Sequence, residues 1–345
     1  MKSSIIIVGV LAIILIAASA YRSARDGGEF EIPSGEPRVL EEAASRADIP
    51  SGAERSDREI FVTAGVKHSI PLDEILSGGP PKDGIPSIDD PRFVSVKKAD
   101  AFLDDDEPGL AVIVNGDARF YPYKILVWHE IVNDVVGGRA VVITYCPLCR
   151  TGIVFDRNLG GKPVEFGVSG KLWRSNLLMY NRTGDAKTES LWSQILGEAV
   201  VGPDTGARLA VIPANTVRYG GWKRKYPDTK VLSEDTGSIR PYGTDPYGDY
   251  YTSERVSFGA VFDDNRAHPK TAVVGIRVGD VYKAYDADAL PVGETRDVVG
   301  EIGIVIAKSD IGEIAVFAGD DEKPLPFVYG FWFAWLAAHP DTLFQ

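Results

Sequence analysis

The sequence of 345 residues has few of the side chains that ligate metals or carry redox chemistry: two cysteines, two methionines and four histidines. Two cysteines exclude the disulfide-rich scaffolds, which need several bridged pairs. A second Cys-x-x-Cys step is missing, so the strong structural-zinc pattern is absent. A G-x-S-x-G motif and a phosphate-binding loop are missing too, which leaves a serine hydrolase or a nucleotide-binding protein without support.

Clusters of basic residues are also lacking. The chain has 37 Lys and Arg against 49 Asp and Glu, a net charge of −12 and a pI near 4.9. Binding to nucleic-acid phosphates needs a concentrated basic surface, so we predict no nucleic-acid partner. Hydrophobic residues make up 44% of the chain, which is enough to bury a sizeable core in one large domain or two small ones.

The N-terminus has the pattern of an export signal. Lys2 precedes an apolar run over residues 5–18, and Ala18-Ser19-Ala20 offers the small residues that signal peptidase cleaves after. We predict a signal peptide or N-terminal membrane anchor over 1–20 and an extracytoplasmic body, periplasmic or at the cell surface. Any contact with a membrane would be made through this segment alone. Residues 21–58 are rich in Gly, Ser, Glu, Arg and Pro, which predicts a disordered tether.

Regular patterns begin at residue 110. LAVIV predicts a strand, Asn115-Gly116 a tight turn, and ARFYPY the returning strand. Pro122 opens a predicted helix whose apolar stripe includes Trp128, with His129 beside it, and Gly137-Gly138 ends it. The next predicted strand, residues 141–145, leads directly into the cysteines.

Cys146 and Cys149 lie in a Cys-Pro-Leu-Cys step between two predicted strands. This spacing suits a redox dithiol or half of a thiolate metal site. Arg150 follows at once, and its fixed positive charge favours the thiolate form. A structural cysteine pair is the alternative, although so small a ring constrains the unfolded chain little.

The chain contains an internal repeat. Residues 115–144 match 278–307 at an offset of 163, and a Trp-to-Pro-Asp-Thr segment beginning at Trp222 matches one beginning at Trp335 at an offset of 113. We therefore predict an α+β fold of two related β-rich repeats with short helices packed on sheets. The first repeat, 59–252, carries an added cysteine-containing segment of about 50 residues that the second, 253–345, lacks.

Several pieces of the chain resemble one recognised family. They are YPYKILVWHEIVND, YCPLCRTG with VFDR, FGVSG, LLMY, LWSQ, HPKT and HPDT. They are similar to the exported domain-of-unknown-function family 3179, found in exported or membrane-anchored proteins of bacteria and archaea. The resemblance covers most of residues 75–345. It implies a shared set of residues, without an established reaction: Cys146, Cys149, His129, Met179 and Ser193-Gln194.

Three functions remain open from the sequence, and they leave undecided whether the protein is an enzyme. The first is a soft-metal site, with copper(I) favoured over zinc because thiolate and thioether ligands select it. Cys146 and Cys149 would be its primary ligands and Met179 or His129 would complete it. The second is an extracytoplasmic thiol–disulfide oxidoreductase. The third is a non-catalytic binding or assembly module with a structural cysteine pair. Four residues would support the site: Arg150, Tyr145, Trp128 and Gln194.

Overall fold

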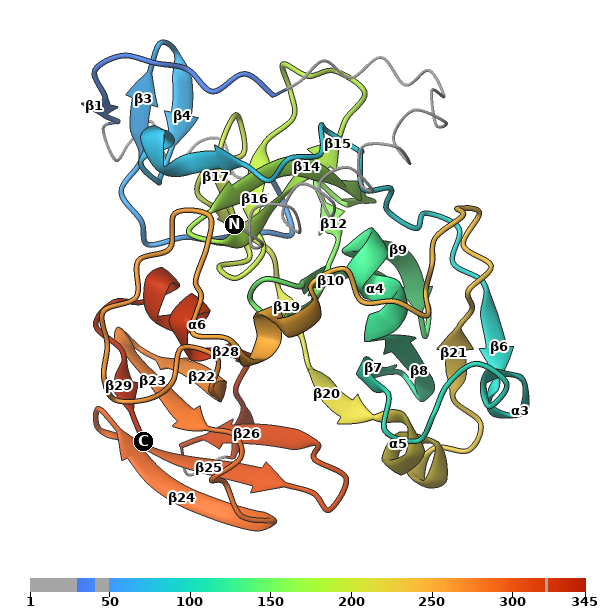
Figure 1. Ribbon diagram of the computed structural model, residues 1–345. Helices are drawn as coiled ribbons and strands as arrows, with labels where there is room; N and C mark the ends of the chain where they lie inside the picture. The colour runs from blue at the N-terminus through green and yellow to red at the C-terminus, as the bar shows by residue number, and fades with distance from the viewer. Residues whose placement is uncertain (1–29, 41–49, 320–321) are drawn as a thin grey trace, which may run out of the picture.

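The computed structural model describes residues 30–40, 50–319 and 322–345, and Figure 1 shows them as several small sheets with short helices between them. The predicted β-rich fold with short helices is confirmed in this coarse form. That these elements arose by duplication remains a prediction, although two of the sheets share a strand order.

The first of these sheets has the order β20-β7-β8-β21-β6. Neighbouring strands are antiparallel except for β8 and β21, which run parallel because α5 connects β20 to β21. Its elements are β6 (Phe93–Ser95), β7 (Pro108–Val114), β8 (Asp117–Pro122), β20 (Ala214–Arg218), α5 (Tyr219–Lys225) and β21 (Lys230–Leu232).

The second sheet has the order β28-β22-β23-β29, and its pairs are again antiparallel, antiparallel and parallel. The connection from β28 to β29 also runs through a short helix, α6. The elements are β22 (Ala272–Val278), β23 (Val281–Asp286), β28 (Phe327–Phe331), α6 (Trp332–Ala338) and β29 (Leu343–Phe344). In Figure 1 this sheet lies at the lower left, and the first lies at the right.

Each of these sheets has an antiparallel meander inserted between its strands in the chain. Between β8 and β20 come β9 (Ile131–Val136), β10 (Arg139–Cys146) and β11 (Thr151–Asp156), with β19 (Val211–Ile212) at the edge. Between β23 and β28 come β24 (Gly293–Val299), β25 (Ile302–Lys308), β26 (Ile314–Ala318) and β27 (Lys323–Pro324). The cysteines lie at the turn between β10 and β11.

A larger sheet is built from strands that precede and strands that follow the cysteine turn in the chain, and it covers that turn. Its main path is β1-β3-β4-β17-β16-β15-β14-β5, and β18 joins β17 to β2. The strands are β1 (Arg38–Val39), β2 (Glu54–Arg55), β3 (Phe61–Thr63), β4 (Val66–His68), β5 (Ile75–Ser77), β14 (Glu165–Trp173), β15 (Asn176–Arg182), β16 (Leu191–Ser193), β17 (Glu198–Val201) and β18 (Ala207–Arg208). The remaining elements are η1 (Leu72–Glu74), α3 (Val96–Ala99), α4 (Tyr123–His129), β12 (Asn158–Leu159), β13 (Lys162–Pro163) and η2 (Gly248–Thr252).

The predicted helix after Pro122 is shorter than the sequence pattern indicates. It ends at His129, Glu130 adopts a positive φ of 59°, and residues 131–136 form β9. These residues are β-branched at four of six positions, and all of them pair with β10. The chain therefore reverses beside His129 and brings Glu130 next to the strand that carries Cys146.

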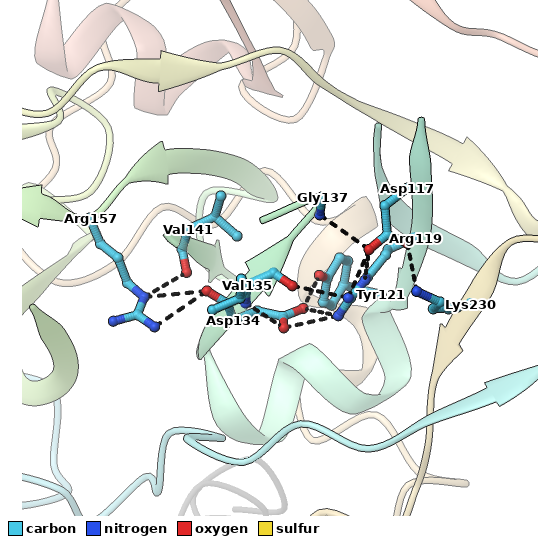
Figure 2. A network of polar contacts seen from close by, with 9 residues as sticks. All are labelled: Asp117, Arg119, Tyr121, Asp134, Val135, Gly137, Val141, Arg157 and Lys230. Carbon is cyan, nitrogen blue, oxygen red and sulfur yellow. Dashed lines mark hydrogen bonds and ion pairs between the residues drawn. The ribbon is translucent and has the colours of Figure 1, made fainter. Parts of the chain in front are cut away.

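A buried polar network fixes β9 against the first sheet (Figure 2). Arg119 donates two hydrogen bonds to the Asp134 carboxylate, at 2.8 and 2.9 Å, and Tyr121 donates a third. Arg157 donates to the backbone carbonyl of Asp134 at 3.4 Å and to that of Val141 at 3.1 Å. Asp134 and Arg119 are only 6% and 9% exposed. Each of these two buried charges has the other as its partner, which offsets the cost of burying it.

Two described parts of the predicted tether are bound to the body. β1 pairs with β3, and β2 pairs with β18. The amide of Leu40 donates to the carbonyl of Ile60, and Ser56 Oγ donates to Glu198 at 2.7 Å. These edge hydrogen bonds do not need hydrophobic periodicity, which is why composition did not indicate them. The predicted signal peptide or anchor, 1–20, lies outside the described residues. Within the described ranges, no helix is long and apolar enough to cross a membrane.

Candidate dithiol site

The cysteines occupy a tight turn between two paired strands. Cys146 is the last residue of β10 and pairs with Thr151, the first residue of β11. The amide of Cys149 donates to the carbonyl of Cys146 at 3.2 Å, and the amide of Arg150 donates to that of Pro147 at 3.2 Å. Arg150 has a positive φ of 50°, which closes the turn. The expected placement of both cysteines on a turn between strands is thus what the structure shows.

Both thiols are buried and converge on one backbone oxygen. Cys146 and Cys149 are 1% and 0% exposed, and neither forms a disulfide. Their Sγ atoms lie 3.6 and 3.4 Å from the carbonyl oxygen of Ser175, to which each thiol can donate. Ser175 lies in the turn between β14 and β15, and its amide donates to the carbonyl of Phe258. The larger sheet therefore supplies a fixed acceptor above the dithiol.

Buried amide side chains hold the site from the other side. Asn176 Nδ2 lies 3.6 Å from Cys149 Sγ and donates to Gln194 Oε1 at 2.9 Å. Thr151 Oγ1 donates to the same Gln194 oxygen at 2.8 Å, and Gln194 Nε2 donates to Thr144 Oγ1 at 3.1 Å. Gln194 thus supports the site through Asn176. None of these hydrogen bonds joins Gln194 to a cysteine sulfur.

The two thiols have different environments. Burial raises the pKa of the Cys146 thiol, but hydrogen bonds from the Cys149 thiol and from the backbone amides of Cys149, Leu177 and Leu148 outweigh it, and the pKa lies below its ordinary value. Burial raises the pKa of the Cys149 thiol, and the neighbouring Cys146 sulfur raises it further, to well above its ordinary value. Cys146 is therefore the thiol that ionises first.

Two polar atoms near the thiols have no hydrogen-bond partner among the described residues. They are Lys270 Nζ and Tyr250 Oη, on side chains that are 7% and 3% exposed. Lys270 Nζ lies 3.4 Å from the centre of the Tyr250 ring and 4.4 Å from that of Phe333. Burial lowers the pKa of Lys270 to about 8, while the charges of Cys149 and Cys146 act in the opposite direction. We call Cys146, Cys149, Asn176, Tyr250 and Lys270 the dithiol cluster.

Glu130 is a buried acid beside this cluster. Its side chain is 7% exposed, and burial together with the charge of Cys146 raises the pKa of its carboxyl well above the ordinary value. Burial raises the pKa of Tyr247 as well, and the charges of Glu130 and Cys146 add to the effect. Burial therefore favours the protonated form of Glu130, which lies beside the thiol that ionises first.

His129 does not have a free ring nitrogen. Nδ1 lies 2.7 Å from the carbonyl oxygen of Pro86, so it donates there, and Nε2 lies 2.7 Å from Tyr242 Oη. Burial lowers the pKa of His129 to about 4. Among the described residues, no three His, Cys, Asp or Glu side chains form a group that could hold a metal ion. Each ring nitrogen of His129 therefore has a protein partner in the structure.

Met179 lies in the same hydrophobic core cluster as both cysteines. It is fully buried in β15, where it pairs with Val168 on one side and Trp192 on the other. Its participation in a metal site stays a prediction. Trp128 lies further out, and its indole nitrogen donates to the carbonyl of Thr244 at 3.2 Å.

A cavity of about 550 Å³ adjoins the dithiol cluster. Tyr145, Arg150 and Tyr251 form part of its wall, and they are the chain neighbours of Cys146, Cys149 and Tyr250 respectively. Tyr145 stacks on Tyr123 with ring centres 4.2 Å apart. The Arg150 guanidinium lies over the rings of Tyr251 and Phe331. The predicted supporting residues Tyr145 and Arg150 thus separate the thiols from this cavity.

Sequence reasoning missed part of the cluster. Lys270 lies in the HPKT piece and Tyr250 in the tyrosine-rich stretch 240–251, and neither residue was expected at the site. Glu130 follows His129 directly and was not singled out either. Both segments can be recognised in the sequence, but their proximity to the cysteines cannot.

A family model described as "Protein of unknown function (DUF3179)" matches residues 82–323, which is 242 of the 345 residues. The chain belongs to this family. The resemblance inferred from the sequence is thereby confirmed. The DUF3179 match includes both cysteines, Glu130, Tyr250 and Lys270. No curated protein and no solved structure matches the chain.

Proposed function

We propose that this DUF3179 protein is a thiol–disulfide oxidoreductase whose Cys146 and Cys149 exchange two electrons with a substrate. One observation carries the proposal: two adjacent thiols share the Ser175 carbonyl, but only Cys146 receives several backbone amide hydrogen bonds. These donors stabilise a thiolate at Cys146, while Cys149 stays a thiol. An attacking thiolate paired with a second thiol is the arrangement that disulfide exchange requires.

The reaction balances with a disulfide as oxidant. Cys146 thiolate attacks one sulfur of the substrate disulfide, an S–S bond breaks and one substrate thiolate leaves. Cys149 then loses its proton and attacks the Cys146 sulfur of the mixed disulfide, which releases the second substrate thiolate. The cysteine pair loses two electrons and two protons, and the substrate becomes two thiols. The reverse sequence oxidises a dithiol substrate.

Amide donors do the work that a helix N-terminus does in many redox dithiols. A β-strand follows the second cysteine here, so the turn does not lead into a helix. The amides of Leu148, Cys149 and Leu177 supply the positive ends of fixed dipoles instead. Glu130, whose carboxyl pKa is raised by burial, is the neighbouring acid that can return a proton to Cys146 when that sulfur leaves as a thiolate.

The test is an equilibrium titration of the full-length protein with reduced and oxidised glutathione. We expect a reversible internal disulfide, seen as the loss of two titratable thiols and of two hydrogen atoms in mass. Its reduction potential should lie between about −270 and −120 mV, the range of working dithiols. A potential below about −300 mV would instead identify a structural disulfide, and the proposal would then be wrong.

Two matched variants separate the roles of the thiols. Cys149→Ser should trap a mixed disulfide with the reagent, because the second attack is lost. Cys146→Ser should trap far less, because the remaining thiol lacks the amide hydrogen bonds. Equal trapping by both variants would contradict the assigned order of attack.

Copper(I) binding by the same thiols is the second candidate, and the observation that favours it is the burial of Met179 in one core cluster with both cysteines. Competition with a copper(I) chelator tests it. Met179→Leu removes the thioether, so it should weaken copper binding. Because it nearly preserves the side-chain volume, it should leave the reduction potential of the cysteine pair unchanged. If the protein neither competes for copper(I) nor forms the disulfide, a structural cysteine pair in a binding or assembly module is the remaining explanation.

A further inference from the structure

The thiols of the dithiol cluster are enclosed too tightly for a protein disulfide to reach them. Cys146 and Cys149 expose 1% and 0% of their surfaces, and neither lines the cavity of about 550 Å³ whose wall includes Tyr145, Arg150 and Tyr251. A sulfur in a folded substrate protein would need these side chains to leave. A molecule of a few atoms needs only a small displacement of them.

The cluster also contains two donors that lack an acceptor. Lys270 Nζ and Tyr250 Oη are buried and without a hydrogen-bond partner among the described residues. Leaving a buried ammonium or hydroxyl unpaired costs about 1–3 kcal/mol or more, so such atoms call for a specific explanation. Both groups interact electrostatically with Cys149 and Cys146. Their positions suit a ligand oxygen held beside the sulfurs.

Aromatic rings surround the Lys270 ammonium and hold it in place, but they do not neutralise its positive charge. Its ammonium lies within 6 Å of the rings of Tyr250, Phe333 and Phe331, at 3.4, 4.4 and 5.3 Å. Ring faces attract a cation but do not accept a full hydrogen bond, so the N–H groups remain available to an oxygen atom. No carboxylate of the described residues forms an ion pair with Lys270.

We infer that the substrate of the dithiol cluster is a small hydroperoxide, with Cys146 as the attacking sulfur and with Lys270 and Tyr250 as the groups that bind the departing oxygen. This rests on the dithiol redox function proposed above and goes beyond it, because the oxidant is a hydroperoxide and not a disulfide. Donors placed where negative charge develops stabilise the transition state directly. Lys270 and Tyr250 would then be catalytic residues, supplied by chain segments more than 100 residues after the cysteines.

The chemistry balances in two steps. Cys146 thiolate attacks the terminal oxygen of R–O–O–H, the O–O bond breaks, and an S–O bond forms as a sulfenic acid. The departing R–O⁻ takes a proton from Lys270 and leaves as an alcohol, or as water when R is hydrogen. Cys149 thiol then displaces the sulfenic hydroxyl, which gives the disulfide and one water molecule. A small external dithiol restores the reduced pair and is oxidised by the same two electrons.

Hydrogen peroxide is the probe, and the rate of thiol loss from reduced full-length protein is the measurement. A buried thiol without a binding site reacts more slowly when folded than when unfolded. We therefore expect the folded protein to react at least about tenfold faster than the same protein in denaturant at the same pH. Cys149→Ser should accumulate a sulfenic acid that dimedone traps. A folded rate at or below the unfolded rate would overturn the inference.

Variants connect the rate to the two donors. Tyr250→Phe removes only an unpartnered hydroxyl, so folding should be unaffected, and Lys270→Met removes the charge. Each should slow the peroxide reaction by roughly tenfold or more, and Lys270→Arg should recover part of the loss. Tyr226→Phe, which removes a hydroxyl bonded to Glu313 outside the cluster, should change nothing. If Tyr250→Phe and Lys270→Met both react as fast as the native protein, the inference is wrong.

The glutathione titration distinguishes this inference from the function beneath it. A disulfide that forms with oxidised glutathione, combined with a folded peroxide rate no faster than the unfolded one, removes the hydroperoxide substrate and leaves the oxidoreductase. A protein that forms no disulfide with either reagent removes both.

Discussion

The turn after β10 and the turn after β25 occupy the same place in two similar meanders, yet only the first carries thiols. β9 and β10 pair through Val136 and Arg139, and β24 and β25 pair through Val299 and Ile302, at the predicted offset of 163. At this offset the counterpart of Cys146 is Ser309. Similar strands thus lead to different chemistry, so the strands alone do not make the site.

The surroundings of the two turns differ more than the strands do. The first turn is covered by the larger sheet, and its Cys149 carbonyl accepts the amide of Phe331 from β28 at 2.9 Å. The second turn faces α5 of the first sheet, where Glu313 contacts Lys225 and Tyr226. Each turn therefore contacts the strand–helix unit of the other sheet. The two turns therefore differ in enclosure, because Cys146 and Cys149 are buried beneath the larger sheet while Ser309 is partly exposed.

The largest expected difference between the two halves concerns their buried aspartates. Asp134 accepts from Arg119 and Tyr121, and Asp297 accepts from Lys283 and Tyr285. Asp134→Ala should lower the free energy of unfolding by about 3 kcal/mol. It removes the bidentate partner of Arg119, which keeps Asp117 as its carboxylate partner, and it leaves the Tyr121 hydroxyl without its acceptor.

Asp297→Ala is the matched control and should cost less than half as much. The side chains of Lys283 and Asp297 are 13% and 20% exposed, so water can reach the charge that remains. Urea unfolding of both variants is the measurement. Equal losses in the two halves would show that the second network is buried as tightly as the first.

The next expected effect is on thiol accessibility. A variant with Cys146 and Cys149 changed to Ser and with Ser309→Cys places one thiol at the equivalent turn, where the residue is partly exposed. Iodoacetamide should modify this thiol about a hundredfold faster, or more, than it modifies the native pair, because a buried group reacts only after local opening. Denatured samples of both proteins should react at similar rates. Rapid modification of the native pair would contradict the enclosure on which the comparison depends.

The smallest expected effect is on acid stability and concerns the buried histidines. The pKa of His129 is lowered to about 4 by burial and that of His339 to about 3. The unfolded chain, with a pKa near 6.5, then binds more protons than the folded one below pH 6.5, so stability falls as pH decreases toward 4. Each histidine should contribute a loss of about 2 kcal/mol by pH 5.

His129→Gln and His339→Gln test this contribution separately. Each variant should show a smaller slope of the free energy of unfolding against pH between 6.5 and 4, measured by urea titration. The slope above pH 7.5 should match that of the native protein. An unchanged slope in His129→Gln would mean that this histidine is already protonated, or exposed, in the folded state.

The sequence predicted the coarse fold and the cysteine turn because both depend on local pattern. Alternation and the Asn115-Gly116 turn define the β7–β8 hairpin, and β-branched residues define β10. It failed at residues 131–136, where helical spacing of apolar residues competed with strand pairing and tertiary contacts decided. The role of His129 as a possible ligand stays a prediction. No local pattern in the sequence reveals that Pro86 and Tyr242 contact its two ring nitrogens.

The contact between the Cys149 carbonyl and the Phe331 amide has a consequence for the order of assembly. Phe331 follows Cys149 by 182 residues (331 minus 149). At about 5–20 residues per second, a ribosome needs about 10–40 s to supply that stretch. During this interval the strand that closes the turn does not yet exist, and both thiols of the nascent chain are open to oxidants and chaperones. The dithiol is thus among the first reactive groups to be made and among the last to be enclosed.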